Sequence, residues 1–456
     1  MNNEFNWQSA SDSGCKYELA SLEANQRLSA EVNQGIKISA GAPRITSFFD
    51  EPGNGTKVVT DAIRGARESV DMWNFHLTDP LAVQALKDAD SKNHADVEVI
   101  LDRDQIEKDA KRHPERLTVL KQLQDAGVNA MASSDGFTIS HPKTFLIDGK
   151  SSYITTMNLT PYLKTFRDVG VSTDDPMIAN DLEELFEADK YNATHVDEKT
   201  GTGKTETPAM LSPFLVVSPI DEAPDKAELL KDAKSISKAV SALPEEQREA
   251  ALNAFDIASP KYTSLEQLRA EQELSKLQNG DELVQLFAEK MQDQQINRIQ
   301  SLIDKAQTKV VGEVENISAK EILNSIINAA SRGVEVSLII PEQFGIKGQV
   351  NSNQIAEDIL LEAGEKLEAK GLPGIHIKEM PVYREPKPGE PYMHAKWLVA
   401  DDKEAYLGSV NYSYNSLHKA REIGLILNDK PAMQEMVTNF NEDWAVSKDV
   451  PERKPS

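Results

Sequence analysis

A histidine–lysine–aspartate pattern occurs twice in this chain, and the repetition constrains the fold more than any other sequence feature. The segment "HPKTFLID" begins at His141, and "HAKWLVAD" begins at His394. Each has a lysine two residues after the histidine and an aspartate seven residues after it. Chance readily produces one such segment, but two copies that agree at several further positions are orders of magnitude rarer. The repetition therefore indicates a duplicated structural unit.

The agreement continues on the C-terminal side of both segments. "TTMN" and "GSVN" follow at the same distance, so a hydroxyl residue and an asparagine recur in each copy. "FRDVGV" then places Asp168 27 residues past the first histidine, and "AREIGLIL" places Glu422 28 residues past the second. The matched positions are His141 and His394, Lys143 and Lys396, Asp148 and Asp401, Thr156 and Ser409, Asn158 and Asn411, and Asp168 and Glu422.

The sequence upstream of each motif repeats as well, which predicts a duplicated fold. Short apolar strands are expected at 70–75 and 309–314, and each is followed by an amphipathic helix and a second apolar strand. Thr78 with Pro80 suits one helix start, and Ser318 with Glu321 forms a capping-box pattern at the other. This order predicts a layered α/β fold with helices on both faces of each sheet.

The two repeats are expected at residues 43–190 and 211–430. The other segments are expected to be an N-terminal arm (1–42), a Gly-, Thr- and Pro-rich linker (191–210), a charged helical insertion within the second repeat (about 222–295), and a C-terminal helix and tail (431–456). The insertion has no counterpart in the first repeat, and its charged helical faces are typical of solvated surfaces.

The chain of 456 residues is long enough to bury two cores. A single cysteine, Cys15, excludes an intramolecular disulfide and a Cys-rich zinc site. The first residues lack a signal-peptide pattern, and no apolar run approaches membrane-spanning length. We therefore expect a cytoplasmic protein, or one secreted without a standard signal peptide.

The residue types of the motif suit chemistry at a phosphoryl group. Lysine offers a positive charge and asparagine a neutral donor to the non-bridging oxygens of a phosphate. Histidine can act near neutral pH as a nucleophile or as a general acid or base. A carboxylate bonded to the far nitrogen of each imidazole would fix its tautomer, a role open to Asp168 and Glu422. We expect no metal ion and no other cofactor to be needed, because the motifs contain no cluster of metal ligands.

The paired HxKxxxxD segments, with "TTMN" and "GSVN" behind them, closely resemble the phospholipase D superfamily, which includes phospholipases D, cardiolipin synthases, phosphatidyltransferases and some nucleases. The resemblance implies two repeated α/β/α sandwich halves related by a pseudo-twofold axis. It implies that His141 and His394 are the catalytic pair, and that the N-terminal copy, His141, is favoured as the nucleophile. The implied phosphate clamp consists of Lys143, Lys396, Asn158 and Asn411.

The same resemblance assigns roles to the remaining motif residues. Thr156 and Ser409 would line the site with hydroxyl groups, whereas Asp148 and Asp401 would brace the local structure. His76 is a candidate for the rim of the site, because it aligns with Asn316 at the end of the equivalent strand. One position departs from the family pattern: Thr155 stands where the second copy has Gly408 and where the family usually has glycine. A larger residue there would narrow the pocket or require a different backbone conformation.

Three functions are compatible with this motif pair. The first is a phospholipase D-like enzyme that hydrolyses phospholipids or transfers their phosphatidyl group, and the second is a nuclease with the same chemistry. The net charge of −24 disfavours a nucleic-acid backbone and strongly anionic membranes, and favours zwitterionic lipids or a soluble phosphodiester. The third, a catalytically silent binding protein, is disfavoured because both copies keep every reacting residue. A lipid substrate would bring peripheral membrane contact, and a monomer suffices since one chain holds both half-sites.

Overall fold

Two eight-stranded sheets carry the two motifs, one in each half of the chain. The computed structural model describes residues 42–113, 117–161, 166–197, 199–208, 211–212, 214–219, 298–342, 352–381 and 392–450. The expected N-terminal arm up to residue 41, the helical insertion and the tail from residue 451 lie outside the described residues.

The first half alternates strands and helices before it reaches its motif. Its elements are β1 (Ile45–Glu51), α2 (Gly55–Gly65), β2 (Ser69–Asn74), α3 (Pro80–Asn93), β3 (Asp96–Leu101), α4 (Arg103–Arg112), α5 (Val119–Gln124), β4 (Asn129–Ala132), β5 (Lys143–Ile147), β6 (Ser151–Thr155), β7 (Phe166–Thr173) and α6 (Pro176–Thr194). The motif lysine is thus the first residue of β5, and the motif histidine lies just before this strand.

The second half repeats this order. Its elements are β8 (Leu215–Ser218), α12 (Arg298–Lys305), β9 (Lys309–Val314), α13 (Lys320–Ser331), β10 (Glu335–Pro341), α14 (Ser352–Glu368), β11 (Ile375–Met380), β12 (Tyr392–Met393), β13 (Lys396–Ala400), β14 (Glu404–Gly408), α15 (Tyr414–His418), β15 (Glu422–Leu427), α16 (Lys430–Val446) and β16 (Lys448–Asp449). Here β13 begins with the motif lysine, as β5 does in the first half.

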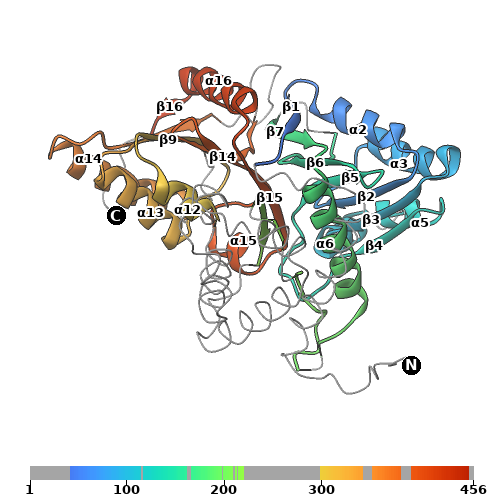
Figure 1. The fold of residues 1–456 in the computed structure, drawn as a ribbon. Coiled ribbons are helices and arrows are strands. Elements are labelled where there is room, and N and C mark those ends of the chain that lie inside the picture. Colours follow the sequence, from blue (N-terminus) through green and yellow to red (C-terminus); the bar gives the residue numbers. More distant parts are fainter. Residues whose placement is uncertain are drawn as a thin grey trace, which may run out of the picture. The chain divides into compact units, whose positions relative to one another are not determined.

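The two sheets correspond strand for strand (Figure 1). The first has the order β1-β7-β6-β5-β2-β3-β4, with β12 of the second half paired to β7 as its eighth strand. The second has the order β8-β15-β14-β13-β9-β10-β11, with β16 added at its far edge as its eighth strand. In both, the βαβ strands pair in parallel and the strands from the motif onward pair antiparallel. The predicted α/β fold with two repeated halves is confirmed.

Strand alternation explains why helices cover both faces of the first sheet. Val70 and Met72 of β2 join the buried cluster with residues of α2 and α3. The neighbouring residue Trp73 points the other way and meets Phe186 of α6 edge to face, with ring centroids 4.7 Å apart. Because both faces of β2 are apolar, this strand can only be stable between two helical layers.

Two predicted helix starts are each wrong by one residue. The N-cap of α3 is Asp79, not Thr78, and its carboxylate accepts a hydrogen bond from the backbone N–H of Leu81. The capping box predicted at Ser318 does not form, since Ala319 holds the N-cap position of α13 without a side-chain bond. The cause is tertiary. In each half the two backbone N–H groups before the helix donate to one carbonyl oxygen, that of Leu159 or Tyr412, just after the motif asparagine.

The described residues within 42–206, 214–219 and 298–450 belong to one compact unit. Helix α6 continues to Thr194, past the expected end of the first repeat at residue 190, and α16 is the expected C-terminal helix. None of the helices in the described ranges combines the length and the apolar character that crossing a membrane requires.

Candidate active site

Each motif histidine is carried by a segment that pairs with the opposite half of the molecule. Ser140 forms a bridge with Arg421, and the backbone N–H of His141 donates to the carbonyl oxygen of Arg421 at 2.8 Å. Likewise β12 runs parallel to the start of β7, and the backbone N–H of His394 donates to the carbonyl oxygen of Arg167 at 3.0 Å. The two motifs therefore cross between the sheets and reach a shared site.

The two predicted carboxylates bond to the imidazoles in a crossed arrangement. Nδ1 of His141 lies 2.9 Å from Oε2 of Glu422, and Nδ1 of His394 lies 2.8 Å from Oδ1 of Asp168. Both carboxylates are fully buried and both histidines are about one-twentieth exposed. Because Nδ1–H donates to the carboxylate, Nε2 of each neutral ring carries the free lone pair. Each histidine thus depends on an acid from the other repeat.

The two motif lysines have different neighbours. Lys143 donates to the carbonyl oxygen of His141 at 2.6 Å and lies over the ring of Phe75, whose centroid is 5.1 Å from Nζ. Lys396 donates to the carbonyl oxygen of His394 and also forms an ion pair of 2.7 Å with Glu315. Both lysines are fully buried, although charged lysines are rarely so. Their placement brings two positive charges to the histidines.

Glu315 is a site residue that the sequence analysis missed. It follows β9 directly, at the position that Phe75 holds after β2 in the first half. Its carboxylate accepts hydrogen bonds from Lys396, from the amide of Asn411 at 3.3 Å and from the hydroxyl of Tyr392 at 3.2 Å. Nε2 of His394 lies 3.6 Å from the same carboxylate. An alignment of the two repeats shows a charged residue at this position in the second half and an apolar one in the first. That difference in charge is the sequence signal that could have identified Glu315.

The pKa values at the site follow from burial and neighbouring charges. Burial lowers the pKa of His141 to about 4, against the opposing charge of Glu422. Burial also lowers the pKa of Lys143 to about 7. For Glu315, burial alone would raise the pKa, but the charges of Lys396 and His394 hold it well below its usual range. At neutral pH, His141 is therefore an unprotonated base and Glu315 a carboxylate.

Asn158 and Asn411 occupy matching positions beside the histidines and lysines. Among the described residues, the side-chain oxygen of each amide is buried without a hydrogen-bond partner. The hydroxyls of the preceding residues are engaged within the protein: Thr156 donates to Asp168 at 2.5 Å, and Ser409 donates to the carbonyl oxygen of Ile423 at 3.1 Å. The site-lining role of Thr156 and Ser409 stays a prediction. In the structure both hydroxyls bond to the strands that carry Asp168 and Glu422, β7 and β15.

Asp148 and Asp401 hold turns together. Oδ1 of Asp148 accepts from the backbone N–H groups of residues 67–69, at 2.7 to 3.1 Å. Oδ1 of Asp401 accepts from residues 307–309 in the same way, and from the hydroxyl of Thr308. Both aspartates tie the end of the motif strand to the start of β2 or β9. This geometry agrees with the bracing role that the sequence indicated.

His76 lies two residues after the end of β2, and among the described residues it forms no hydrogen bond, ion pair or ring contact that assigns it to the site. The side chain is partly buried, and burial lowers its pKa, with smaller effects from the charges of Asp109, Arg112 and Lys143. Its aligned residue Asn316 lies beside Glu315. A role for His76 at the rim of the site stays a prediction.

Comparison with known proteins identifies the fold and its motif pair. The family model described as "Cardiolipin synthase, PLD-like domain" matches residues 59–190 and 299–444, which is more than half of the chain. The chain belongs to the phospholipase D superfamily. It is therefore a member of a family of phosphodiesterases and phosphatidyltransferases, as the sequence resemblance implied.

Individual relatives of this phospholipase D family member are distant. "Phospholipase D Y" of Dictyostelium discoideum is 26% identical over 113 residues, which cover 25% of this chain and 22% of the relative. "Phospholipase D" of Rickettsia bellii (strain RML369-C) is 29% identical over 118 residues, 26% of this chain and 54% of the relative. The matches thus span about a fifth and about half of these curated relatives. The crystal structure of phosphatidylserine synthase from Haemophilus influenzae Rd KW20 covers 94% of this chain and 92% of its own, with a TM-score of 0.53 and 13% identity, and shares the fold.

The departure from the family glycine at Thr155 has a structural explanation. In the second half, the hydroxyl of Tyr406 accepts the backbone N–H of Val410 beside Gly408. In the first half, the hydroxyl of Thr155 itself accepts the equivalent N–H, that of Met157, at 3.1 Å. Thr155 also donates to the carbonyl oxygen of Lys143 at 2.9 Å. Thr155 thus takes over the hydrogen bond that Tyr406 accepts in the second half, lies at the end of a regular strand and bonds to the backbone of the motif lysine.

A second pair of crossed contacts lies behind the histidines. Arg167, next to Asp168, forms a two-pronged bond with Asp443 of α16, at 2.6 and 2.8 Å. Arg421, next to Glu422, is fully buried and pairs with Asp189 of α6 at 2.9 Å. The sequence signal was present, since an arginine precedes both acids in "FRD" and "ARE". These pairs fasten each acid-bearing strand to the helix of the other half.

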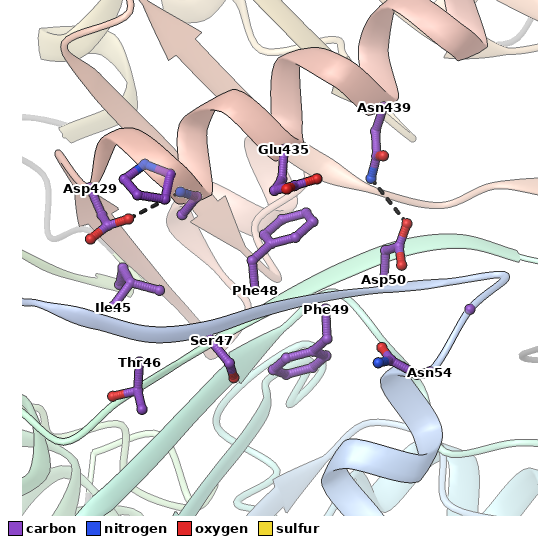
Figure 2. Close-up of a pocket in the computed structure, with 13 residues that line it drawn as sticks. Ile45, Thr46, Ser47, Phe48, Phe49, Asp50, Asn54, Asp429, Glu435 and Asn439 are labelled. Atoms are coloured by element: carbon purple, nitrogen blue, oxygen red, sulfur yellow. Dashed lines mark hydrogen bonds between the residues drawn. The ribbon is translucent and has the colours of Figure 1, made fainter.

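A cavity of about 620 Å³ lies between β1 and α16, lined by residues 45–50 and by Asp429, Glu435 and Asn439 among others. Figure 2 shows Phe48 pointing from β1 toward α16 and Phe49 pointing to the opposite side, with Asn439 bonded to Asp50. None of the motif residues lines this cavity. It is therefore separate from the candidate active site. Within the described ranges, no three His, Cys, Asp or Glu side chains gather in an arrangement that could hold a metal ion.

Proposed function

We propose that this protein is a metal-independent phospholipase D-like phosphodiesterase that acts on phospholipids through a phosphohistidine on His141. The supporting observation is the crossed pairing of His141 with Glu422 and of His394 with Asp168. It gives one site two imidazoles, each held by a buried carboxylate, together with two lysines that carry the positive charge a phosphoryl group needs.

His141 is the better nucleophile of the pair. Its Nδ1–H donates to Glu422, so Nε2 presents a lone pair, and its low pKa keeps the ring unprotonated at neutral pH. As Nε2 forms a bond to phosphorus, Glu422 stabilises the positive charge that develops on the ring. The low pKa also means that burial opposes the charged ring, so the buried carboxylate is needed for the covalent step.

His394 suits the role of general acid and base. A protonated His394 has two carboxylate partners, Asp168 at Nδ1 and Glu315 near Nε2. It donates its Nε2 proton to the departing alcohol oxygen as the phosphorus–oxygen bond breaks. The neutral ring then takes a proton from water or from an acceptor alcohol. The oxygen of that molecule attacks the phosphohistidine, which releases His141 and the product.

A phospholipid substrate is supported by the family and by charge. The family model and the two curated relatives carry names of lipid enzymes, and the net charge of −24 disfavours long polyanions. Because hydrolysis and phosphatidyl transfer share the phosphohistidine, the same site serves water or an alcohol as acceptor.

The deciding experiment incubates purified protein with EDTA and with phosphatidylcholine or phosphatidylethanolamine vesicles, and in parallel with single- and double-stranded DNA. Release of the head group without DNA cleavage supports the proposal, and added primary alcohol should then divert product to the transferred lipid. DNA cleavage without head-group release would place the protein among the nucleases of the superfamily. Loss of activity with EDTA would contradict the metal-independent mechanism.

A further inference from the structure

In the second half, the carboxylate of Glu315 contacts the side chains that are proposed to hold the substrate phosphate. Three of the residues assigned to the reacting phosphate converge on the carboxylate of Glu315: Lys396 at 2.7 Å, Asn411 at 3.3 Å and His394 at 3.6 Å. A carboxylate and a phosphoryl group present similar charged oxygens to such donors. The glutamate side chain therefore occupies the position that the substrate's non-bridging oxygens would take.

The first half supplies an internal comparison. There the equivalent residue is Phe75, which packs edge to face on His141 with ring centroids 4.6 Å apart and lies under Lys143. In the described part of the chain, Lys143 forms no ion pair with a carboxylate. One half-site therefore presents a lysine that, among the described residues, has no carboxylate in direct contact, and the other presents a lysine already paired with a carboxylate.

Glu315 has a hydrogen-bond partner besides Lys396 and Asn411. Its Oε1 accepts from the hydroxyl of Tyr392, whose ring packs on Phe166 at 5.2 Å, and Phe166 in turn faces His394 at 5.4 Å. About one-fifth of the Glu315 side chain is exposed, whereas Lys396 is fully buried. A phosphate that takes over Lys396 and Asn411 would thus leave the carboxylate beside it, on the open side of the site.

Resting on the proposed function, we propose that Glu315 determines substrate specificity in two linked ways. In the free protein it occupies the phosphoryl position of the second half, and a bound phosphodiester displaces it. The displaced carboxylate then accepts a hydrogen bond from an ammonium or hydroxyl group next to the substrate phosphate. A partly buried carboxylate without a partner is costly, so phosphodiesters that bring such a donor bind in preference to those that bring none.

The first test measures the binding of inorganic phosphate by calorimetry at neutral pH. Glu315→Gln removes the charge at constant shape, and Glu315→Phe copies the first half. Both variants should bind phosphate about tenfold more tightly than the wild type, because a competing negative charge is gone. The reciprocal variant Phe75→Glu should bind it about tenfold more weakly. Unchanged or weaker binding in both Glu315 variants would overturn the proposal and leave Glu315 as a structural partner of Lys396.

The second test compares two soluble phosphodiesters on a His141→Ala background, which prevents turnover. Glycerophosphoethanolamine carries donors next to its phosphate, and dimethyl phosphate carries none. With Glu315 present, the ratio of their dissociation constants should favour the first by about tenfold, and Glu315→Gln should remove most of that preference. An equal ratio with and without the glutamate would overturn the specificity role.

These measurements separate the inference from the proposed function, because both read binding and not catalysis. If wild-type protein turns over no phosphodiester, the proposed function fails while the binding data still decide the role of Glu315. If turnover is found but phosphate binding does not respond to Glu315, the inference alone fails. A melting curve for each variant identifies loss of folding, and the Phe75→Glu variant tests the same idea at a site that lacks the native ion pair.

Discussion

Single residues make the two half-sites unequal, although their motifs are the same. The aromatic ring of Phe75 packs against His141 and Lys143, and burial lowers the pKa of both groups. Glu315, at the matching position, places one negative charge beside His394 and Lys396. Under the proposed mechanism, this difference favours His141 as the nucleophile and His394 as the general acid and base. Two imidazoles can thus divide the labour without any change in the motif.

The division of labour predicts different responses to the leaving group. His141→Ala should abolish turnover of every phosphodiester, because no nucleophile remains. His394→Ala should abolish turnover of an unactivated diester, but with bis(4-nitrophenyl) phosphate it should still release a burst of nitrophenol, since that leaving group needs no proton. Rapid-mix absorbance measures the burst. A burst in His141→Ala and none in His394→Ala would reverse the two roles.

The lowered pKa of Lys143 predicts the pH range of substrate binding. The ammonium form binds phosphate, and with a pKa of about 7 it loses its proton as the pH rises through that value. At the acid end, His141 becomes protonated below about 4 and can no longer attack. Hence kcat/KM should form a plateau between about pH 4 and 7. Lys143→Arg should remove the fall above pH 7, because arginine keeps its charge. An unchanged alkaline limb in this variant would exclude Lys143 as its cause.

At the level of secondary-structure elements, two aspartate turns fix the register of the motif strands. Asp148 and Asp401 both have a φ of 55°, a conformation that few residues other than glycine, asparagine and aspartate adopt readily. In this conformation each carboxylate accepts hydrogen bonds from the backbone N–H groups just before β2 or β9. The motif lysine begins the strand that ends in this turn. The turn therefore helps to set the position of the lysine and the histidine along the strand direction.

Removing the Asp401 carboxylate should destabilise the fold with a defined pH dependence. Although burial opposes it, hydrogen bonds from Thr308 and the neighbouring backbone N–H groups lower the pKa of Asp401 to about 2. A lowered acid pKa stabilises the fold above the unfolded-state pKa of about 4, and this contribution disappears as the pH falls through about 2. Asp401→Asn should therefore cost about 2 kcal/mol at pH 7 and much less at pH 2 to 3.

Urea unfolding of wild type and Asp401→Asn at the two pH values measures this difference. Asparagine keeps the size of the side chain and the tolerance for positive φ, so backbone strain does not contribute. Lys403→Ala, which alters an exposed neighbour, is the matched control and should be nearly neutral. An equal cost at both pH values would contradict the charge-based explanation.

In the molecule as a whole, every site histidine and every supporting arginine finds its acid in the opposite repeat. His141 pairs with Glu422 and Arg421 pairs with Asp189, and the symmetric contacts are His394 with Asp168 and Arg167 with Asp443. Two ion pairs and two histidine–carboxylate hydrogen bonds thus join the repeats around the site, and the site exists only when both halves are assembled. Binding at the site should accordingly stabilise the contact between the halves.

The buried Arg421–Asp189 pair gives a test of this arrangement. Arg421 is fully buried, and it also donates to the carbonyl oxygens of Ser218 and Glu206 at 3.1 and 3.0 Å. Arg421→Met should cost about 3 to 5 kcal/mol of unfolding free energy, because it leaves Asp189 buried without its partner. The double variant Arg421→Met/Asp189→Leu should recover a large part of that loss. Thermal melting compares the three proteins, and an additive double variant would mean that the pair carries no coupling.

Local sequence pattern was sufficient for the repeat, for most strands and for the paired motif residues of the candidate site, but not for Glu315. Strand 309–314 lies where it was predicted, and the histidines, lysines and acids named from spacing do meet. These features depend on alternation and on residue spacing, which neighbouring residues fix. The helix starts at Thr78 and Ser318 were predicted wrongly because the carbonyl oxygens of Leu159 and Tyr412, distant in sequence, hold the preceding backbone.

The pairing within the site had to come from three-dimensional packing. Spacing identified Asp168 and Glu422 as partners of the imidazoles, but each acid follows its own histidine in sequence while it bonds to the other one. Glu315 likewise contacts Lys396, which lies 81 residues away in the sequence. Residue spacing encodes which groups a half contributes. Which histidine each acid binds depends on strands that cross between the two sheets. Such long-range contacts leave no local pattern in the sequence.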